Sequence, residues 1–255
     1  MRLKPKKSLG QNFLIDRNIR KKIVSACDFS PEDVILEIGP GRGELTAEIA
    51  QQVKKVFAVE IDHHLCAQLK GRFCDEKKIE IIHADILKFD LNKLKPQNKK
   101  IKIVGNIPYY ISTPIIEYII ERRGRIASAY LTVQKEFAGR IVSGPGSKEF
   151  GALSCFVQYY LKPEIVFDIK KGSFFPVPKV ASSFLKLEVR SAPAVKVEDE
   201  EYFFKIIRSA FNQRRKILRN SLAKILSEEK LGSLKLKRPE ELSLEDFSGL
   251  AGETN

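Results

Sequence analysis

Two periodicities divide this chain into elements. Short apolar, β-branched runs alternate in the first half with longer amphipathic segments, which is the pattern of parallel strands joined by helices. The runs predict buried strands at residues 34–38, 55–60, 79–84, 101–105 and 126–133. Helices are predicted at residues 44–52 and 61–73, and another after Ser112, with Thr113 as N-cap and Pro114 at the first helical position. The expected fold class is α/β, a parallel sheet covered by helices on both faces.

The pattern changes in the second half. Residues 159–169 and 183–189 predict extended segments that could close the sheet with an antiparallel edge. Residues 191–194 (SAPA) are a candidate linker, and residues 200–226 and 239–250 have a helical pattern. We therefore expect two domains, residues 1–190 with the sheet and residues 191–255 as a small helical domain.

The composition indicates a globular protein with an anionic partner. Of the 255 residues, 43% are apolar, which is ordinary for a folded core, but the net charge of +13 at pH 7 is high. So basic a chain favours nucleic acid or an anionic membrane surface as partner. No run of about 18 apolar residues is present, so no membrane span is expected.

Location and metal content are also constrained. Residues 1–7 are basic but lack the apolar stretch of a secretion signal and are too short for a transit peptide, so we expect a cytoplasmic protein. The cysteines show no C-x-x-C spacing and the three histidines no metal-ligand spacing. Free thiols in a reducing compartment, and no metal site, are the expectation.

A glycine-rich loop, residues 39–43 (GPGRG), follows the first predicted strand. Gly39 and Gly41 allow a sharp turn and close approach of a ligand, and the next helix presents free N–H groups. Glu60, at the end of the second strand, is spaced to bind ribose hydroxyls. These features fit a dinucleotide or S-adenosylmethionine. The third glycine comes too early for G-x-G-x-x-G, and the Glu37 carboxylate suits a cationic ligand, so S-adenosylmethionine is favoured.

Two further strand ends carry polar groups to the same edge of the sheet. Asp85 can accept a hydrogen bond from an adenine amino group or act as an N-cap. Asn106 opens the sequence Asn-Ile-Pro-Tyr. Its amide oxygen and a loop carbonyl could hold both hydrogens of an exocyclic amine, which frees the nitrogen lone pair for attack. Pro108 stiffens the loop, and Tyr109 offers a ring on which a base can stack.

These motifs, in this order, resemble those of the ribosomal RNA adenine N6,N6-dimethyltransferases, specifically the small-subunit (16S) type. The resemblance covers nearly the whole chain. Beyond the loops above, it rests on residues 7–14 (KSLGQNFL), 134–140 (QKEFAGR), 145–148 (PGSK), 174–180 (FFPVPKV) and 210–216 (AFNQRRK). One position departs from the family: Ala181 stands where an Asp is usual, so a role for that carboxylate does not carry over.

The resemblance implies a Rossmann-like class I methyltransferase sheet that uses S-adenosylmethionine. The implied reaction is methyl transfer to N6 of two adjacent adenosines near the 3′ end of small-subunit rRNA, during ribosome biogenesis. Residues that would line the cofactor site are Gln11, Asn12 and Leu14. Gly39 would approach the methionine part and Asn106 both the methionine and the target amine. Phe174 would stack the extruded base opposite Tyr109.

A basic segment near the C-terminus extends the argument to RNA. Residues 202–227 contain seven Lys and Arg and no Asp or Glu, and Arg208, Arg215 and Arg219 fall at helical spacing. A basic face without acids is typical of a surface that contacts phosphates. The expected RNA-contacting residues, here and in the N-terminal arm, are Lys4, Lys6, Lys7, Arg208, Arg214, Arg215, Lys216 and Arg219.

The sequence thus predicts an S-adenosylmethionine-dependent rRNA adenine N6-dimethyltransferase. We expect a monomer that acts on small-subunit rRNA within an assembling subunit and has no membrane partner. Alternatives are a large-subunit rRNA methyltransferase that confers antibiotic resistance, a non-catalytic nucleic-acid-binding relative, and a nicotinamide dehydrogenase. Residues 174–178 and 210–216 favour the small-subunit type, and the complete cofactor motifs argue against the non-catalytic relative.

Overall fold

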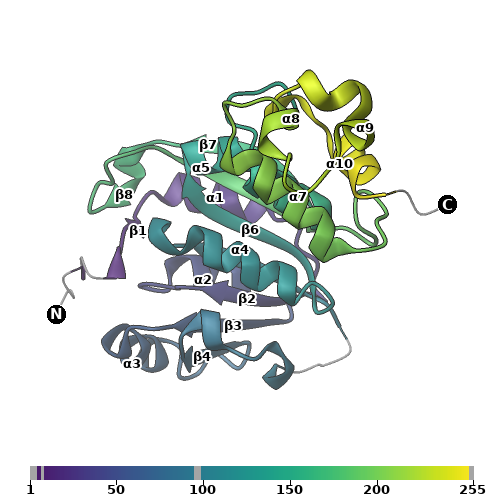
Figure 1. The fold of residues 1–255 in the computed structure, drawn as a ribbon. Helices are drawn as coiled ribbons and strands as arrows, with labels where there is room; N and C mark the ends of the chain where they lie inside the picture. Colours follow the sequence, from purple (N-terminus) through teal and green to yellow (C-terminus); the bar gives the residue numbers. More distant parts are fainter. Residues whose placement is uncertain (1–4, 7–8, 95–98, 253–255) are drawn as a thin grey trace. The chain divides into compact units, whose positions relative to one another are not determined.

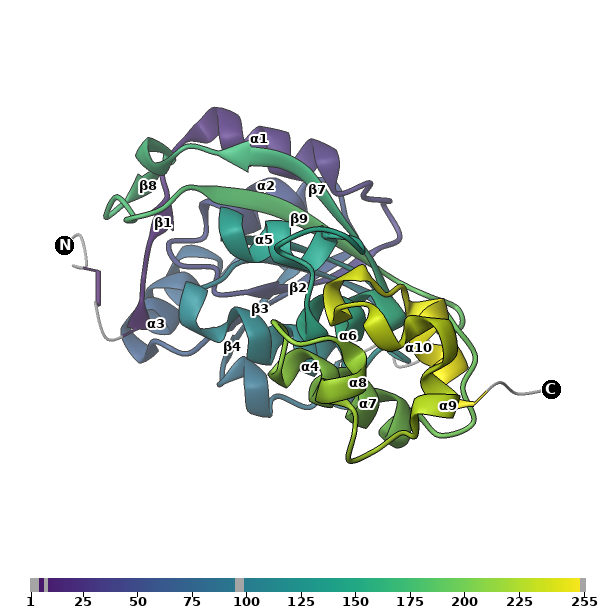
Figure 2. The same cartoon turned by 45° about the horizontal axis from the view of Figure 1, so that its top comes forward.

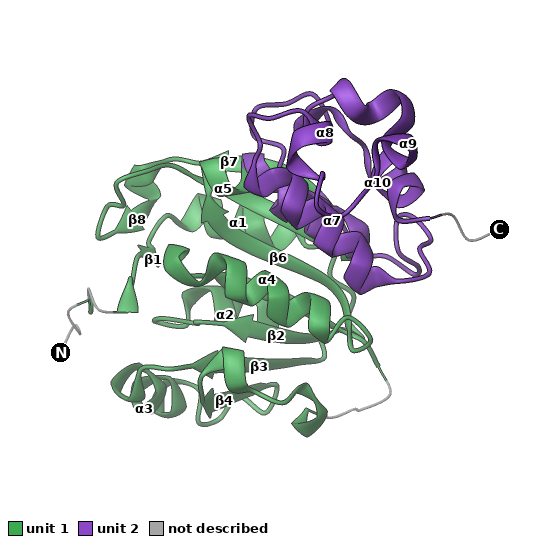
Figure 3. Ribbon diagram, viewed as in Figure 1, with its two compact units in different colours: residues 1–138, 164–189 green, residues 139–163, 190–255 purple. Residues whose placement is uncertain are grey.

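A computed structural model describes residues 5–6, 9–94 and 99–252. The chain forms two compact units, residues 1–138 with 164–189 and residues 139–163 with 190–255 (Figure 3). The sequence placed one boundary near residue 190, whereas residues 139–163 also belong to the second unit. The reason is aromatic packing: rings of Phe156, Tyr159 and Tyr160 lie 5.2–6.0 Å from the ring of Phe204.

The first unit is built on a seven-stranded sheet with the strand order β4-β3-β2-β5-β6-β9-β7 (Figure 1). The strands are β2 (Val34–Ile38), β3 (Lys55–Glu60), β4 (Ile79–His83), β5 (Ile101–Asn106), β6 (Ile126–Gln134), β7 (Leu161–Ile169) and β9 (Ser182–Val189). Strands β2 to β6 pair in parallel, and β9 is antiparallel to β6. The expected α/β class is confirmed.

Helices cover both faces of this sheet, which explains why its central strands are largely apolar. The helices are α1 (Arg17–Ala26), α2 (Glu44–Ala50), α3 (His63–Arg72) and α4 (Ser112–Glu121), and α5 (Lys135–Val142) runs from the first unit into the second. Ile23 of α1 and Ile49 of α2 share one core with Ile35 and Val56 of the sheet. Helix α4 lies on the opposite face from α1 and α2 (Figures 1 and 2). Strands buried on both faces are typical of a parallel sheet.

The start of α4 differs from the sequence prediction. A short 3-10 helix, η4 (Tyr109–Ile111), leads directly into α4, and Ile111 N–H donates to the Pro108 carbonyl oxygen at 3.2 Å. The N-cap is therefore Ile111, and Thr113 and Pro114 lie within the first turn. The predicted Thr113 cap was wrong because the Asn-Ile-Pro-Tyr loop already turns as a helix.

A separate two-stranded sheet fastens the N-terminal segment. Strand β1 (Phe13–Leu14) pairs antiparallel with β8 (Phe174–Phe175), with Phe13 opposite Phe175 and Leu14 opposite Phe174 (Figure 2). Short 3-10 helices complete the unit: η2 (Ile86–Lys88), η3 (Leu91–Lys93) and η5 (Lys171–Ser173). Segments 160 residues apart in the chain thereby meet.

The second unit is helical. Its helices are α6 (Ala152–Tyr160), α7 (Glu200–Asn212), α8 (Leu218–Ser221), α9 (Glu228–Leu231) and α10 (Leu244–Ala251), with the 3-10 helices η6 (Gly232–Leu236) and η7 (Pro239–Glu241). One helix over residues 200–226 was predicted, but α7 ends at Asn212. Lys216 N–H turns back to Gln213 and Leu218 N–H pairs with Lys237, so the next helix starts anew.

Two further predictions bear on the class of protein. Among the described residues, no helix is long and apolar enough to cross a membrane. The cysteines are free; Cys27, Cys66 and Cys155 are buried and Cys74 is exposed. Burial raises the pKa of the Cys155 thiol to about 12, so this sulfur stays protonated and acts as part of the core.

Candidate active site

A cavity of ≈ 280 Å³ opens at the carboxyl edge of the sheet, where β2, β3, β4 and β5 end. In open α/β folds this edge is where ligands bind. Nine of the residues singled out from the sequence line it: Gln11, Asn12, Gly39, Gly41, Glu60, Asp85, Asn106, Pro108 and Tyr109. Residues from Gln11 to Tyr109 are thus brought to one site.

The glycine loop forms one wall of the cavity with its backbone. Gly39 has φ +65° and donates its N–H to the Val59 carbonyl oxygen at 3.0 Å. A Cβ at Gly39 would meet nothing within 4 Å, so the loop leaves open space there. Gly41 also has positive φ, and a Cβ on it would lie 3.0 Å from the Phe13 ring. The loop needs glycine for its conformation at both positions and for close packing at Gly41.

Glu60 joins this loop to the next strand. The residue is buried, and its Oε2 accepts the Gly41 N–H at 3.4 Å while Oε1 accepts the Asp62 N–H at 2.8 Å. Burial raises the pKa of the Glu60 carboxyl, and hydrogen bonds from the N–H groups of Asp62, Gly41 and Ile61 oppose this shift. A carboxylate has about four lone-pair positions. With the Ile61 N–H as a third backbone donor, one position remains for a ligand's hydroxyl group.

Asp85 takes both of the roles open to it in the sequence. Its Oδ1 accepts the Leu87 N–H at 3.0 Å and caps η2, and the residue also lines the cavity. The cap fixes the side chain at the sheet edge next to Glu60, so two carboxylates from neighbouring strands face one cavity. Such a pair suits a ligand rich in hydroxyl and amino groups.

A hydrogen bond to the N-terminal segment orients Asn106. Its Nδ2 donates to the Asn12 carbonyl oxygen at 2.7 Å. One of the two amide hydrogens is thereby engaged, and Asn106, which lines the cavity, can accept a hydrogen bond from a ligand through Oδ1. Tyr109 is half-buried, and its hydroxyl lies 2.7 Å from Ser182 Oγ. Burial raises the pKa of this phenol, so the hydroxyl remains a neutral anchor that fixes the ring plane.

The N-terminal segment is held over the cavity by Asp62, the N-cap of α3. Lys6 Nζ contacts Asp62 Oδ1 at 2.9 Å, and Gln11 Nε2 donates to Oδ2 at 3.2 Å. Burial opposes ionisation of Asp62, but hydrogen bonds from Lys6, from the His64 N–H and from Gln11 hold its pKa below the usual value. Sequence reasoning missed this contact; the only signal was an Asp two residues after Glu60.

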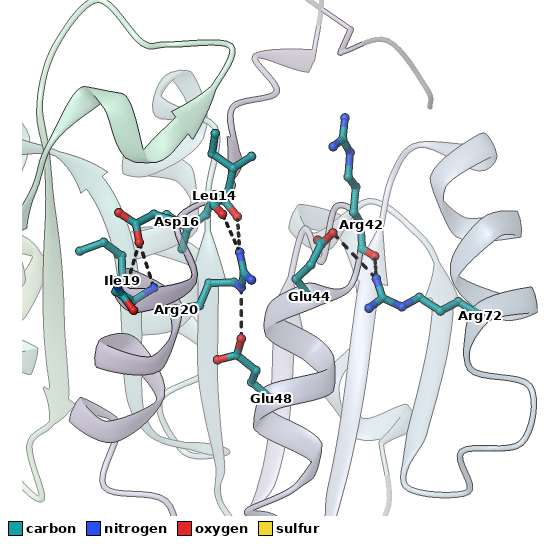
Figure 4. Close-up of polar contacts among 10 residues, drawn as sticks. Leu14, Asp16, Ile19, Arg20, Arg42, Glu44, Glu48 and Arg72 are labelled. Carbon is teal, nitrogen blue, oxygen red and sulfur yellow. Dashed lines mark hydrogen bonds and ion pairs between the residues drawn. The ribbon is translucent and has the colours of Figure 1, made fainter. Parts of the chain in front are cut away.

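Arginines brace the segment that follows (Figure 4). Arg20 Nη1 donates to the carbonyl oxygens of Leu14 at 3.3 Å and Ile15 at 3.1 Å, and its Nε contacts Glu48 of α2 at 3.2 Å. Arg72 of α3 donates to the Arg42 carbonyl oxygen (Figure 4). The Arg42 side chain points away from these contacts (Figure 4) and lies 4.9 Å from the Phe13 ring centroid.

Three predicted residues lie outside the cavity. Leu14 faces the core in the β1–β8 pair and is 9% exposed. Phe174 lies opposite it, is 1% exposed, and belongs to the same core, so it has no free ring face for a base. Strand alternation explains both positions. Glu37 and Leu14 line a smaller neighbouring cavity of ≈ 40 Å³, which Gly39 and Asn106 also border.

Glu37 is the most perturbed carboxyl of the site. It is 2% exposed, and its Oε2 has no hydrogen-bond partner among the described residues. Burial raises its pKa to about 7. An unpaired buried carboxyl is costly unless a ligand compensates it. Its position beside Asn106 fits the cationic ligand predicted from the sequence.

The predicted RNA-contacting residues separate into paired and unpaired side chains. Lys6 pairs with Asp62; Arg214 donates to the Lys148 carbonyl oxygen and lies 3.7 Å from Glu240. Arg219 lies 4.0 Å from Glu228. The sequence predicted that Arg208, Arg215 and Arg219 lie on one helix face. This prediction was wrong, because α7 ends at Asn212, before Arg215 and Arg219. Lys4 and Lys7 lie outside the described residues.

Within the described part of the chain, Arg208, Arg215 and Lys216 form no ion pair, and all three are exposed. The absence of acidic residues between positions 202 and 227 was therefore a poor guide to pairing, because Glu240 and Glu228 reach the segment from outside it. Of the segment's predicted set, these three cations are the ones without an ion pair to any residue that the structure describes.

The comparisons with known proteins agree with this geometry. Residues 2–246 match the family model described as ribosomal RNA adenine dimethylase. A ribosomal RNA small subunit methyltransferase A of Alkaliphilus metalliredigens is 42% identical over 97% of this chain and 91% of its own length. The relative of that name from Moorella thermoacetica is 40% identical over 98% and 92%.

Solved structures support the same assignment. A dimethyladenosine transferase from Plasmodium falciparum superposes with a TM-score of 0.81 and 26% identity, covering 93% of this chain and 95% of that one. The 23S rRNA methyltransferase ErmE gives a TM-score of 0.75 with 26% identity, covering 95% and 100%. On the family match over nearly its full length, the chain belongs to the ribosomal RNA adenine dimethylase family.

Proposed function

We propose that this protein dimethylates N6 of two adjacent adenosines near the 3′ end of small-subunit rRNA, within an assembling subunit, and that it acts as a cytoplasmic monomer. As a member of its family the chain is an S-adenosylmethionine-dependent rRNA adenine dimethyltransferase. The closer likeness is to relatives named for the small subunit, at 42% identity against 26% for the 23S enzyme, which favours the small-subunit target.

The cavity fits S-adenosylmethionine in its charge and its hydrogen-bonding groups. Glu60 and Asp85 offer carboxylate acceptors for ribose hydroxyls and the adenine amino group, and Gly39 leaves space where a Cβ would be. Glu37, buried and unpaired at Oε2, suits the cationic amino acid part. When bound, S-adenosylmethionine supplies an electrophilic methyl group on a sulfonium. Gln11 and Asn12 of the N-terminal segment would cover it and exclude water.

The orientation of Asn106 carries the proposal for the reaction. With Nδ2 held by the Asn12 carbonyl, Oδ1 can accept one hydrogen of the adenine amine, and a carbonyl of the Asn-Ile-Pro-Tyr loop can accept the other. Two acceptors favour a pyramidal nitrogen whose lone pair points to its electrophile. Tyr109, fixed through Ser182, would hold the base plane by stacking. These groups act by position, since no strong base is needed before transfer.

The RNA must present an unstacked adenosine to this cavity. We assign the phosphate contacts of the second unit to Arg208, Arg215 and Lys216, which are exposed and form no ion pair within the described residues. Arg214 and Arg219 would contribute less, because carboxylates already lie near them. The net charge of +13 supports an electrostatic contribution to RNA binding.

Replacement of Asn106 by Ala or by Asp tests the proposed reaction. Both variants should bind S-adenosylmethionine and lose methyl transfer to small subunits by at least about 100-fold, the typical effect of one preorganised group. Aspartate fails because it loses the donor to Asn12 and places a negative charge beside that carbonyl. Asn18→Ala, on the exposed surface of α1, is the matched control. Wild-type turnover in Asn106→Ala would exclude the assigned role.

A further inference from the structure

Exposed apolar side chains of this protein concentrate beside the active site. Seven large apolar side chains are strongly exposed among the described residues. Three of them lie within residues 175–180: Phe175 at 50%, Val177 at 63% and Val180 at 42%. Ile15, 50% exposed, is joined to the same segment by its N–H, which donates to the Ser173 carbonyl oxygen at 2.9 Å. Clustered exposed apolar groups mark a binding surface.

The β1–β8 register shows which way this cluster faces. Residues directly opposite in an antiparallel pair share a face of the sheet. Leu14 and Phe174 share the core face, so Phe13 and Phe175 share the other. Phe13 lines the cofactor cavity. Phe175 therefore stands at the side of the cavity, next to a residue of its wall.

The segment of residues 170–181 is anchored at several points, and these contacts hold its apolar side chains in their exposed positions. Pro178 and Ser173 are buried, and Ser173 Oγ contacts Asp16 Oδ2 at 3.2 Å. Lys171 Nζ donates to the Lys179 carbonyl oxygen across the loop. A loop held in this way loses little entropy when a ligand binds.

The charge of the segment identifies the kind of partner. Residues 170–181 contain three lysines and no acidic residue, and Lys170, Lys171 and Lys179 are all exposed. An aromatic ring and apolar side chains surrounded by ammonium groups are complementary to a nucleic acid, which offers flat bases and anionic phosphates. A protein partner fits less well, because lysine is depleted in protein interfaces and these three lysines form no ion pair with the residues described by the structure.

We propose that Phe175 and Val177 form a second base-binding surface, which holds the nucleotide next to the target adenosine while the target occupies the cavity. The flanking base stacks on Phe175, and Lys171 and Lys179 contact the phosphates on either side of it. This inference rests on the proposed function, because it assigns the neighbour of an adenosine bound near Asn106. Two adjacent targets would then exchange places between the surface and the cavity.

Phe175→Ala is the test, with unmethylated small subunits as substrate. Loss of one stacked base corresponds to about 5- to 150-fold in KM for the subunit, while S-adenosylmethionine affinity and the melting temperature stay unchanged. Phe175→Tyr should restore KM because it retains the ring. Leu236→Ala is the matched control, since Leu236 is 63% exposed and lies in the second unit.

A second substrate tells base stacking from any other contact. Subunits reconstituted with an abasic residue beside the target should raise KM for the wild type, and Phe175→Ala should then add little, because both changes remove one interaction. Full additivity of the two effects, or an unchanged KM in Phe175→Ala, overturns the second surface. Failure of the wild type to methylate normal subunits would instead contradict the proposed function.

Discussion

Replacement of Glu37 by Gln should change how the stability of the protein depends on pH. In the folded protein burial raises the Glu37 pKa from 4.5 to about 7. Between these values the folded state keeps a proton that the unfolded state has lost, so stability falls as the pH rises. Each pH unit corresponds to about 1.36 kcal/mol. The free energy of unfolding of the wild type should thus lose about 3 kcal/mol to this one group.

Gln cannot ionise, so the variant lacks this loss. Gln places an amide group where Glu37 Oε2 has no hydrogen-bond partner, which changes the free energy of unfolding. This change is the same at every pH, so it shifts the whole curve of unfolding free energy against pH without altering its shape. The assay is urea unfolding of both proteins, without ligand, from pH 4.5 to pH 8. The difference in unfolding free energy should grow by about 3 kcal/mol in favour of the variant and level off above pH 7. Glu229→Gln, at an exposed position of the second unit, is the control. Parallel curves for wild type and Glu37→Gln would refute a buried, proton-binding Glu37.

The other predictions concern the N-terminal segment and the basic residues. Asp62→Asn removes the charge that holds Lys6 and Gln11, a partly exposed interaction worth about 1 kcal/mol. Calorimetry should therefore show that S-adenosylmethionine binds about 5- to 10-fold more weakly. Unchanged affinity would mean that the N-terminal segment does not cover the ligand. Arg215→Ala with Lys216→Ala should weaken rRNA binding and lower the slope of log affinity against log salt by about 2. The paired Arg219→Ala should lower that slope less, and an equal effect would show that pairing with Glu228 does not matter.

The strands could be located from the sequence because both faces of a parallel sheet are buried, so that the strands are largely apolar. The site followed from the same rule, since Glu60, Asp85 and Asn106 each come at a strand end and parallel strands end at one edge. What the pattern could not supply was pairing between distant segments. Phe174 and Phe175 are adjacent aromatics, and only their register against β1 decides which of them is buried.

Contacts with residues distant in the sequence also determine which basic side chains are paired. Arg214 looks like its neighbour Arg215 in the sequence, yet Glu240 and the Lys148 carbonyl oxygen engage only the former. Similarly, residues 139–163 join the second unit through aromatic packing that no local signal announces. Local propensity locates elements, whereas contacts across the chain set which surfaces remain free.

The central claim is that the protein methylates adenosines of small-subunit rRNA, and that the reaction takes place in the cavity beneath the N-terminal segment. The most direct measurement uses isotopically labelled S-adenosylmethionine with unmethylated small subunits, unmethylated large-subunit rRNA and a sample without RNA, followed by nucleoside mass spectrometry and mapping of the label. The account predicts N6,N6-dimethyladenosine in the small-subunit sample alone, at two adjacent positions near the 3′ end. Label in the large-subunit rRNA, or no label anywhere from protein that binds S-adenosylmethionine, would contradict it.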